Sequence, residues 1–152
     1  MDDISSLRHI LHTCRTIAVV GLSEQGQRPS YLTAKYMQEH GYKIIPVNPN
    51  YPEILGEKSY ASLLAIPHAV GMVNVFRKTE DVLPIAQQAV QIGAICLWQQ
   101  IGVMNEQADL LAKSKGLMSV MNRCVKIDHA RLIGALHWAD VNTKVISAKR
   151  AV

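Results

Sequence analysis

Cysteines and long apolar runs are scarce in this chain. It has three cysteines among 152 residues, Cys14, Cys96 and Cys124, and no Cys-x-x-Cys pair. An odd, scattered set predicts neither a disulfide framework nor a zinc cage, so we expect three reduced thiols. No apolar run reaches the roughly 20 residues that a membrane helix needs, and Asp2 and Asp3 stand where a secretory signal would be basic. The sequence therefore predicts a cytoplasmic protein with no membrane segment.

Aromatic residues are also few, with two Trp, five Tyr and one Phe. The formal net charge of +4 favours anionic ligands. The basic residues are spread out and not interleaved with aromatics as base stacking requires, so we expect no nucleic-acid partner. What is abundant is apolar: 49% of residues are hydrophobic and 18% charged. This composition predicts one globular domain over residues 1–152, with a core at about 16–140.

Glycines mark where helices give way to strands. Gly41, Gly93 and Gly116 each follow an amphipathic segment and directly precede an apolar run, as expected of helix ends in the left-handed conformation. Alternating helices and apolar strands predict an α/β fold, a Rossmann-like, doubly wound, parallel five-stranded sheet with helices on both faces. The predicted strands are 16–20, 42–46, 71–76, 94–97 and 117–121.

Further helices are predicted at both ends of the chain and between the strands. We expect them at 4–14, before Gly41, at 62–66, around 82–90, from Asn105 to Lys115, and at 129–138, where His137 and Trp138 contribute to packing. The tail 142–152 has no apolar stripe and should fray. Pro46 falls in a strand expected to be interior, where it would remove a ladder donor. Pro84 is tolerable only if its helix begins next to it.

The loop after the first predicted strand has the composition of a phosphate site. A β-branched run ends in a glycine turn, polar residues, an arginine and a Pro-Ser pair that can open a helix. Such a turn brings backbone N–H groups close to an anion, and the next helix points its positive end at it. The pattern Gly21-x-Ser23-x-x-Gly26 is a dinucleotide fingerprint whose middle glycine is replaced by serine. We expect ligand contacts from Gly21, Leu22, Ser23, Arg28, Pro29 and Ser30.

The end of the second predicted strand argues against a nicotinamide cofactor. NAD enzymes need a carboxylate there for the ribose hydroxyls. This chain has Val47, Asn48 and Pro49 at that place, and its next acid is Glu53. NADP needs a nearby arginine instead, and none lies between positions 43 and 58. An NADP-linked oxidoreductase is therefore the alternative and not the favoured function.

Further blocks of residues occur in order along the chain: Ile45-Pro46-Val47-Asn48-Pro49, Gly56-Glu57-Lys58, Val75-Phe76-Arg77, Trp98-x-Gln100-x-Gly102, Asn122-Arg123-Cys124 and His129-x-Arg131. With the first loop, they resemble the small stand-alone coenzyme A-binding proteins, which look like the nucleotide-binding domain of the succinyl-CoA synthetase α-subunit. The resemblance runs from about residue 16 to 132. It implies reversible binding of coenzyme A (CoA) or an acyl-CoA by a non-catalytic binding or regulatory protein.

The resemblance also implies where CoA would lie. The site would be formed by the first loop, the Val47-Asn48-Pro49 loop and the Val75-Phe76-Arg77 segment, with Gln100 and Gly102 in the loop after the fourth strand. CoA carries about four negative charges, which the helix dipole, Arg28 and Arg77 can partly balance. An acid beside the adenosine would repel the 3′-phosphate. Arg77 can equally well pair with Glu80 or Asp81.

Few other residues point to chemistry. Cys124 stands beside Arg123 and near Lys126 and His129, which leads to the hypothesis of a reactive thiol that forms a mixed disulfide with CoA; an inert, buried cysteine is the alternative. His9 and His12 have no third partner for a metal, and we expect Trp98 in the core. We assign no catalytic residue. A homo-oligomer remains open, and so does a CoA-ligase-related subunit that needs a larger partner.

Overall fold

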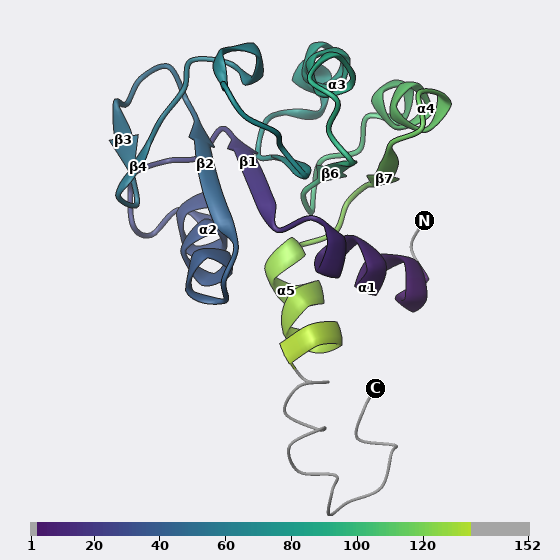
Figure 1. The fold of residues 1–152 in the computed structure, drawn as a ribbon, viewed down its shortest axis with the longest axis horizontal. Helices are drawn as coiled ribbons and strands as arrows, with labels where there is room; N and C mark the ends of the chain where they lie inside the picture. Colours follow the sequence, from purple (N-terminus) through teal and green to yellow (C-terminus); the bar gives the residue numbers. More distant parts are fainter. Residues whose placement is uncertain (1–2, 135–152) are drawn as a thin grey trace, which may run out of the picture.

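Five parallel strands form the centre of the molecule. The computed structural model describes residues 3–134, and Figure 1 shows the sheet between two layers of helices. The strands lie in the order β2-β1-β5-β6-β7, and every neighbouring pair is parallel. Their bounds are β1 Thr16–Val20, β2 Lys43–Val47, β5 Met72–Val75, β6 Cys96–Gln99 and β7 Met118–Val120. The predicted Rossmann-like α/β fold is confirmed, although the fourth predicted strand begins later, at Cys96.

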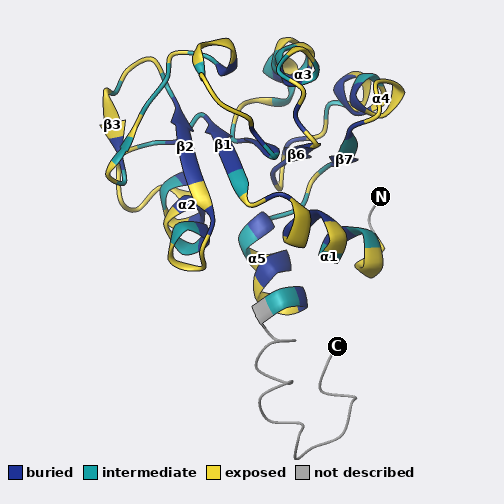
Figure 2. Cartoon of the chain, viewed as in Figure 1, coloured by how far each residue is buried: buried dark blue, intermediate teal, exposed yellow. Residues whose placement is uncertain are grey.

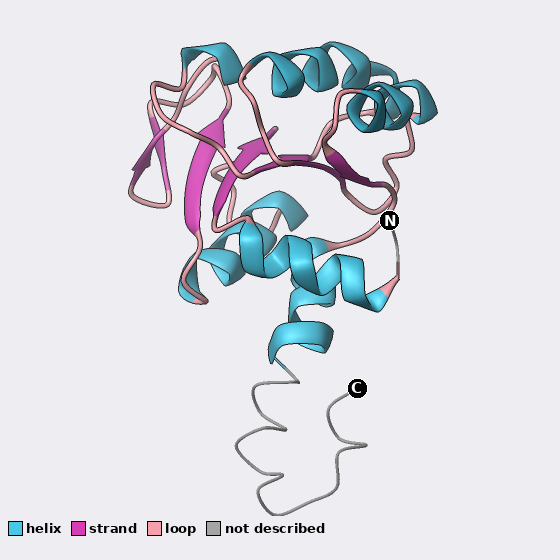
Figure 3. Ribbon diagram, turned by 45° about the vertical axis from the view of Figure 1, so that its right-hand side comes forward, coloured by secondary structure: helices cyan, strands magenta, loops and turns pink. Residues whose placement is uncertain are grey.

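Helices cover both faces of this sheet. One face carries α1 (Ile4–Thr13), α2 (Pro29–Glu39) and α5 (Val125–His129), and the other carries α3 (Val82–Gln91) and α4 (Glu106–Ser114) (Figures 1 and 3). The helix predicted at 129–138 begins earlier, at Val125, and continues as a π-helical segment, Ala130–Gly134. Its predicted end, with His137 and Trp138, and the tail 142–152 lie outside the described residues. In residues 3–134 no helix has the length and hydropathy to cross a bilayer.

Capping side chains and a proline explain where the helices begin. The Asn105 side chain accepts a hydrogen bond of 2.9 Å from the Ala108 amide at the start of α4. A short 3-10 helix, η2 (Thr79–Asp81), leads into α3. Pro84 is the third residue of α3, where its missing N–H costs no bond because the first four N–H groups of a helix have no partner within it. The helix therefore begins next to Pro84, as the sequence analysis required.

The side chains of the strands alternate between two buried layers, and most residues of the strands have the dark blue colour of buried residues in Figure 2. Ile17, Val19 and Trp98 belong to the cluster packed by α1, α2 and α5. Ala18, Val73 and Leu97 belong to the cluster packed by α3 and α4. Burial of successive residues on opposite faces is what a doubly covered parallel sheet requires. The expectation that Trp98 is a core residue is confirmed, since the residue is fully buried.

Pro46 lies in an edge strand, so the prediction of an interior second strand is wrong. β2 is the first strand in the sheet order. Its Lys43 amide donates to Arg15, and its Val47 carbonyl accepts from Gly21, so alternate residues of β2 face β1. Pro46 faces the outer side, where its carbonyl accepts a 3.0 Å bond from the Tyr60 amide. The missing N–H of Pro46 therefore removes no bond from the sheet ladder.

Two short elements between β2 and β5 complete the fold. A hairpin of β3 (Glu53–Ile54) and β4 (Glu57–Lys58) follows β2, and the helical stretch predicted at 62–66 is a 3-10 helix, η1 (Leu63–Ala65). The hairpin was not predicted, because strands of two residues carry no alternation pattern. An ion pair of 2.6 Å between Lys43 and Glu57 joins it to β2.

Candidate functional site

The strand order places a crevice at the carboxyl ends of β1 and β5. The chain runs from β1 to β2 on one side of the sheet, and from β5 to β6 and β7 on the other. In doubly wound sheets ligands bind where the order reverses in this way. Three adjoining pockets open at this edge, with volumes of about 350, 550 and 330 Å³, and we call them the first-loop, central and outer pockets.

The first-loop pocket is built by the segment that follows β1. Its loop is held by its own side chains: the Ser23 amide donates to Ser30 Oγ at 3.0 Å, and the Gln25 amide donates to Ser23 Oγ at 3.1 Å. Arg28 Nε donates to Gln25 Oε1 at 3.2 Å, which leaves the rest of its guanidinium exposed. The pocket is lined by Gly21, Ser23, Gln25, Arg28, Pro29, Ser30, Tyr51 and Phe76.

The start of helix α2 makes this pocket positive. Arg28 is the N-cap residue and Pro29 the first helical residue, and the Arg28 side chain makes no capping hydrogen bond to the first turn. The hydroxyl of Ser30, near the start of the helix, accepts a hydrogen bond from the Ser23 amide. The open N–H groups and the helix dipole both favour an anion here, and the Arg28 guanidinium adds a full charge.

Asn48 ties the first loop to the end of β2. Its Nδ2 donates to the Leu22 carbonyl at 2.9 Å, and its Oδ1 accepts from the Asn50 amide at 2.9 Å. Leu22 itself is fully buried in the core. Both residues therefore hold the loop in place, and neither lines one of the three pockets.

The outer pocket lies between the ends of β1 and β2 and the start of α3. Val47, Pro49 and Arg77 line it, as do the acids Glu80 and Asp81. Arg77 Nη2 lies 3.4 Å from Asp81 Oδ2, and both side chains are largely exposed, so the pairing left open by the sequence is present but weak. Sequence reasoning did not place the two acids in the site, although their position just after β5 was a signal for it.

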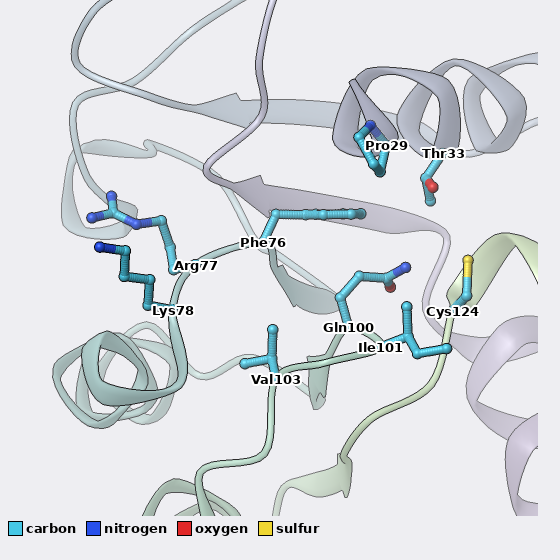
Figure 4. Close-up of a pocket in the computed structure, with 9 residues that line it drawn as sticks. All are labelled: Pro29, Thr33, Phe76, Arg77, Lys78, Gln100, Ile101, Val103 and Cys124. Carbon is cyan, nitrogen blue, oxygen red and sulfur yellow. The ribbon is translucent and has the colours of Figure 1, made fainter. Parts of the chain in front are cut away.

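The central pocket separates α2 from the loop after β6. Figure 4 shows its nine lining residues, Pro29, Thr33, Phe76, Arg77, Lys78, Gln100, Ile101, Val103 and Cys124. Gln100 is buried, and its Oε1 accepts hydrogen bonds from Asn74 Nδ2 at 3.1 Å and from the Val125 amide at 3.2 Å. These bonds connect β5, β6 and α5 beneath the pocket.

Most of the predicted site residues meet at these pockets. The pockets bring together Gly21, Ser23, Arg28, Pro29, Ser30, Val47, Pro49, Phe76, Arg77, Gln100 and Cys124. Leu22, Asn48, Val75 and Gly102 do not line them; Gly102 has a φ of 87° and donates its amide to Asn122 Oδ1 at 2.7 Å, which shapes the loop. Among the described residues, no three His, Cys, Asp or Glu side chains are grouped so that they could hold a metal ion.

Two of the three neighbours that suggested a reactive Cys124, Arg123 and His129, have partners of their own. Arg123 forms a two-point ion pair with Asp128, with Nε to Oδ2 at 2.7 Å and Nη2 to Oδ1 at 2.9 Å. His129 is buried, and its Nδ1 lies 2.9 Å from the hydroxyl of Tyr36. The hypothesis of activation by these two side chains is thus not supported by their geometry. Cys124 itself remains partly exposed in the wall of the central pocket.

Burial, with a smaller contribution from the nearby charges of His40, Arg15 and His12, lowers the pKa of His129 from 6.5 to about 4. The unfolded chain therefore takes up a proton on His129 below about pH 6.5, which the folded protein resists down to about pH 4. We expect the contribution of His129 to the free energy of unfolding to be constant above about pH 6.5 and to be lost as the pH drops from there to about 4. Urea titrations of wild type and His129→Gln at pH 7.5 and 5 measure this, and the variant should show the smaller pH dependence. An equal pH dependence in both proteins would assign the loss to other groups.

Comparison with known proteins identifies relatives over most of the chain. A family model described as a CoA binding domain matches residues 15–130. An uncharacterized Bacillus subtilis protein, YneT, is 40% identical over 126 residues, which are 83% of this chain and 93% of that protein. The solved structure of a hypothetical protein from Pyrococcus horikoshii is 39% identical, with a TM-score of 0.84, and the match covers 87% of this chain and 93% of that one. An ADP-forming acetate–CoA ligase from Archaeoglobus fulgidus is 32% identical over 92 residues, 59% of this chain but 14% of the ligase.

Proposed function

Because this chain belongs to the family of CoA-binding domains, we propose that it binds coenzyme A or an acyl-CoA in the groove made by the first-loop, central and outer pockets. The observation that carries the proposal is the continuity of the three pockets. Pro29 and Phe76 line both the first-loop and the central pocket, and Arg77 lines both the central and the outer pocket. Val20 of the outer pocket and Gly21 of the first-loop pocket are consecutive residues, so the three pockets also meet at the end of β1, where the phosphorylated middle of a ligand with two arms can lie.

In this proposal each part of the ligand has its own pocket. The pyrophosphate lies at the first loop, against Ser23, Arg28 and the open amides of α2. The adenosine lies in the outer pocket, next to Val47 and Pro49, and the pantetheine arm enters the central pocket. The position where NAD enzymes carry a ribose-binding acid is held by Asn48, whose side chain is occupied by Leu22 and Asn50. This supports CoA over a nicotinamide cofactor.

We propose a binding or regulatory role for the chain on its own, in the cytoplasm, where CoA and reduced thiols occur together. The three cysteines are free, which is consistent with that compartment. A second candidate is a subunit of a CoA ligase, because the acetate–CoA ligase relative contains a segment similar to this chain within a much longer protein. Purification of the chain from its natural source tests this candidate: a stable, stoichiometric complex with a larger nucleotide-binding subunit supports the ligase, and an isolated chain carrying CoA supports the binding role.

We expect the Arg28→Ala variant to bind CoA about tenfold more weakly than wild type, since a charge-assisted hydrogen bond is worth about 1.5–3 kcal/mol. Isothermal titration calorimetry with CoA and with NADP measures it. Lys35→Ala is the matched control, because Lys35 is an exposed cation on the same helix and lines none of the three pockets. Wild type that binds NADP but not CoA at about millimolar ligand would refute the proposed function. Equal affinities of both variants for CoA would place the phosphates elsewhere.

A further inference from the structure

The central pocket is faced by an amide donor for which the described residues supply no acceptor. Gln100 is 3% exposed, and its Oε1 takes both hydrogen bonds that reach the side chain, from Asn74 Nδ2 and the Val125 amide. Two donors on one atom fix that atom as the oxygen, so the NH₂ group of the amide is the other one. Across residues 3–134 no hydrogen bond is made by Gln100 Nε2, and the side chain lines the central pocket (Figure 4). The NH₂ group is not closed off from solvent, since Ser119 Oγ is the one fully buried side-chain N or O atom without a partner among the described residues; the group therefore stands open to a ligand acceptor in the pocket.

The second observation is the thiol in the same pocket. Cys14 and Cys96 are fully buried, and burial raises the pKa of Cys14 to about 12 and that of Cys96 well above its usual value. Cys124 is partly exposed and lines the central pocket, on the side toward which the Gln100 amide extends (Figure 4). Among the three cysteines, only Cys124 can meet a ligand without unfolding.

We propose that the central pocket seats the sulfur end of the CoA arm, that Gln100 Nε2 donates to an amide carbonyl of the arm, and that Cys124 forms a mixed disulfide with the CoA sulfur. The proposal rests on the proposed function, because it takes CoA as the ligand. The arm of CoA carries amide carbonyls and ends in a thiol, so it offers both an acceptor for Gln100 and a partner for Cys124. The apolar side chains of Phe76, Ile101 and Val103 cover the methylene groups between them.

The reaction is thiol–disulfide exchange with a CoA disulfide, which is the oxidant. The Cys124 thiolate attacks one sulfur of the CoA disulfide, whose S–S bond breaks as the Cys124–CoA disulfide forms. The second CoA leaves as a thiolate and takes up the proton that Cys124 has lost. One disulfide is consumed and one is made, so atoms and electrons balance. A thiol reductant reverses the step. The protein would thus hold CoA covalently under oxidising conditions and release it under reducing ones.

Intact-mass spectrometry after incubation with CoA disulfide tests the proposal. Wild type should gain one CoA adduct that a reductant removes, and Cys124→Ser, which keeps both buried cysteines, should gain none. Cystamine, a disulfide without the nucleotide and the amides, should label Cys124 at least about tenfold more slowly at equal concentration, because binding of the nucleotide raises the local concentration of the reacting sulfur. Equal rates for the two disulfides, or the same adduct on Cys124→Ser, would overturn the proposal.

Two further measurements separate this proposal from the proposed function and test Gln100. Calorimetry with reduced CoA on wild type measures reversible binding alone; if wild type binds reduced CoA and no adduct forms with CoA disulfide, the CoA site stands and the exchange fails. If reduced CoA does not bind wild type, the proposed function fails first and this proposal with it. Gln100→Glu keeps an oxygen for Asn74 and Val125 but replaces the outward NH₂ group, so the rate advantage of CoA disulfide over cystamine should fall about fivefold. An unchanged ratio in a folded Gln100→Glu variant would remove Gln100 from the proposal.

Discussion

A Gly21→Ala variant is expected to unfold at a clearly lower urea concentration than wild type and to bind CoA poorly. Gly21 has a φ of 88°, and a Cβ placed there would lie 2.5 Å from the Phe76 carbonyl oxygen and 2.9 Å from Arg77 Cδ. The left-handed conformation alone costs a side-chain-bearing residue about 1 kcal/mol. The Phe76 oxygen is backbone and cannot rotate away, so β1 or β5 must shift. We expect a total loss of about 3 kcal/mol or more in the free energy of unfolding.

The binding defect follows from where the clash occurs. Phe76 lines both the first-loop and the central pocket, and Arg77 lines the central and outer pockets. A shift of this segment therefore disturbs all three pockets at once. Gly93→Ala is the control, since Gly93 has a φ of 74° but nothing within 4 Å of an added Cβ. It should cost only about 1 kcal/mol and leave CoA affinity unchanged. Equal losses in the two variants would mean that conformation, and not close approach, is the reason for glycine at position 21.

Gly21 also shows how far the sequence could predict the site. The pattern of a strand, a glycine turn and a helix start located the first loop, because each part has a local signal. The reason for the glycine was not local. The sequence reading assigned it to the approach of a ligand, whereas in the structure the end of β5 approaches it. Position 76 is distant in the sequence, and only the order of the strands in the sheet brings it beside position 21.

The same limit applies to strand order and to polar loop residues. The interior position predicted for Pro46 was wrong, because hydropathy gives the strands but not their order, and β2 is at the edge. Asn48 was chosen as a ligand contact from its place after the second strand and from the family resemblance, and Ser30 from its place in the first loop. In the structure Asn48 donates to the Leu22 carbonyl and Ser30 Oγ accepts from the Ser23 amide, so both residues first serve to hold the loop. A sequence indicates which loops surround a site more readily than which side chains are free within it.

An Arg123→Gln variant is also expected to be strongly destabilised, with a loss of about 3 kcal/mol in the free energy of unfolding. The carboxylate of Asp128 is almost fully buried, with its side chain 4% exposed, and Arg123 meets both of its oxygens. Removal of the cation leaves a buried negative charge without its partner, which costs about 3–5 kcal/mol where a pair is fully buried. Arg123 is 30% exposed, so we expect the lower end of this range. Urea denaturation at pH 7 measures the loss.

Two controls separate the burial of the pair from its short distance. The Lys43–Glu57 pair is equally close, at 2.6 Å, but its side chains are 56% and 28% exposed, so Lys43→Gln should cost less than about 1 kcal/mol. Arg123→Gln combined with Asp128→Asn should be more stable than Arg123→Gln alone, because the double variant buries no unpaired charge. If the double variant loses the sum of the two single losses, the residues act independently and the ion pair does not hold this loop. If the double variant recovers part of the loss, the pair holds the segment that carries Cys124 at the central pocket. Trp98 Nε1, which donates to the Arg123 carbonyl at 2.8 Å, is a second contact that holds the same segment.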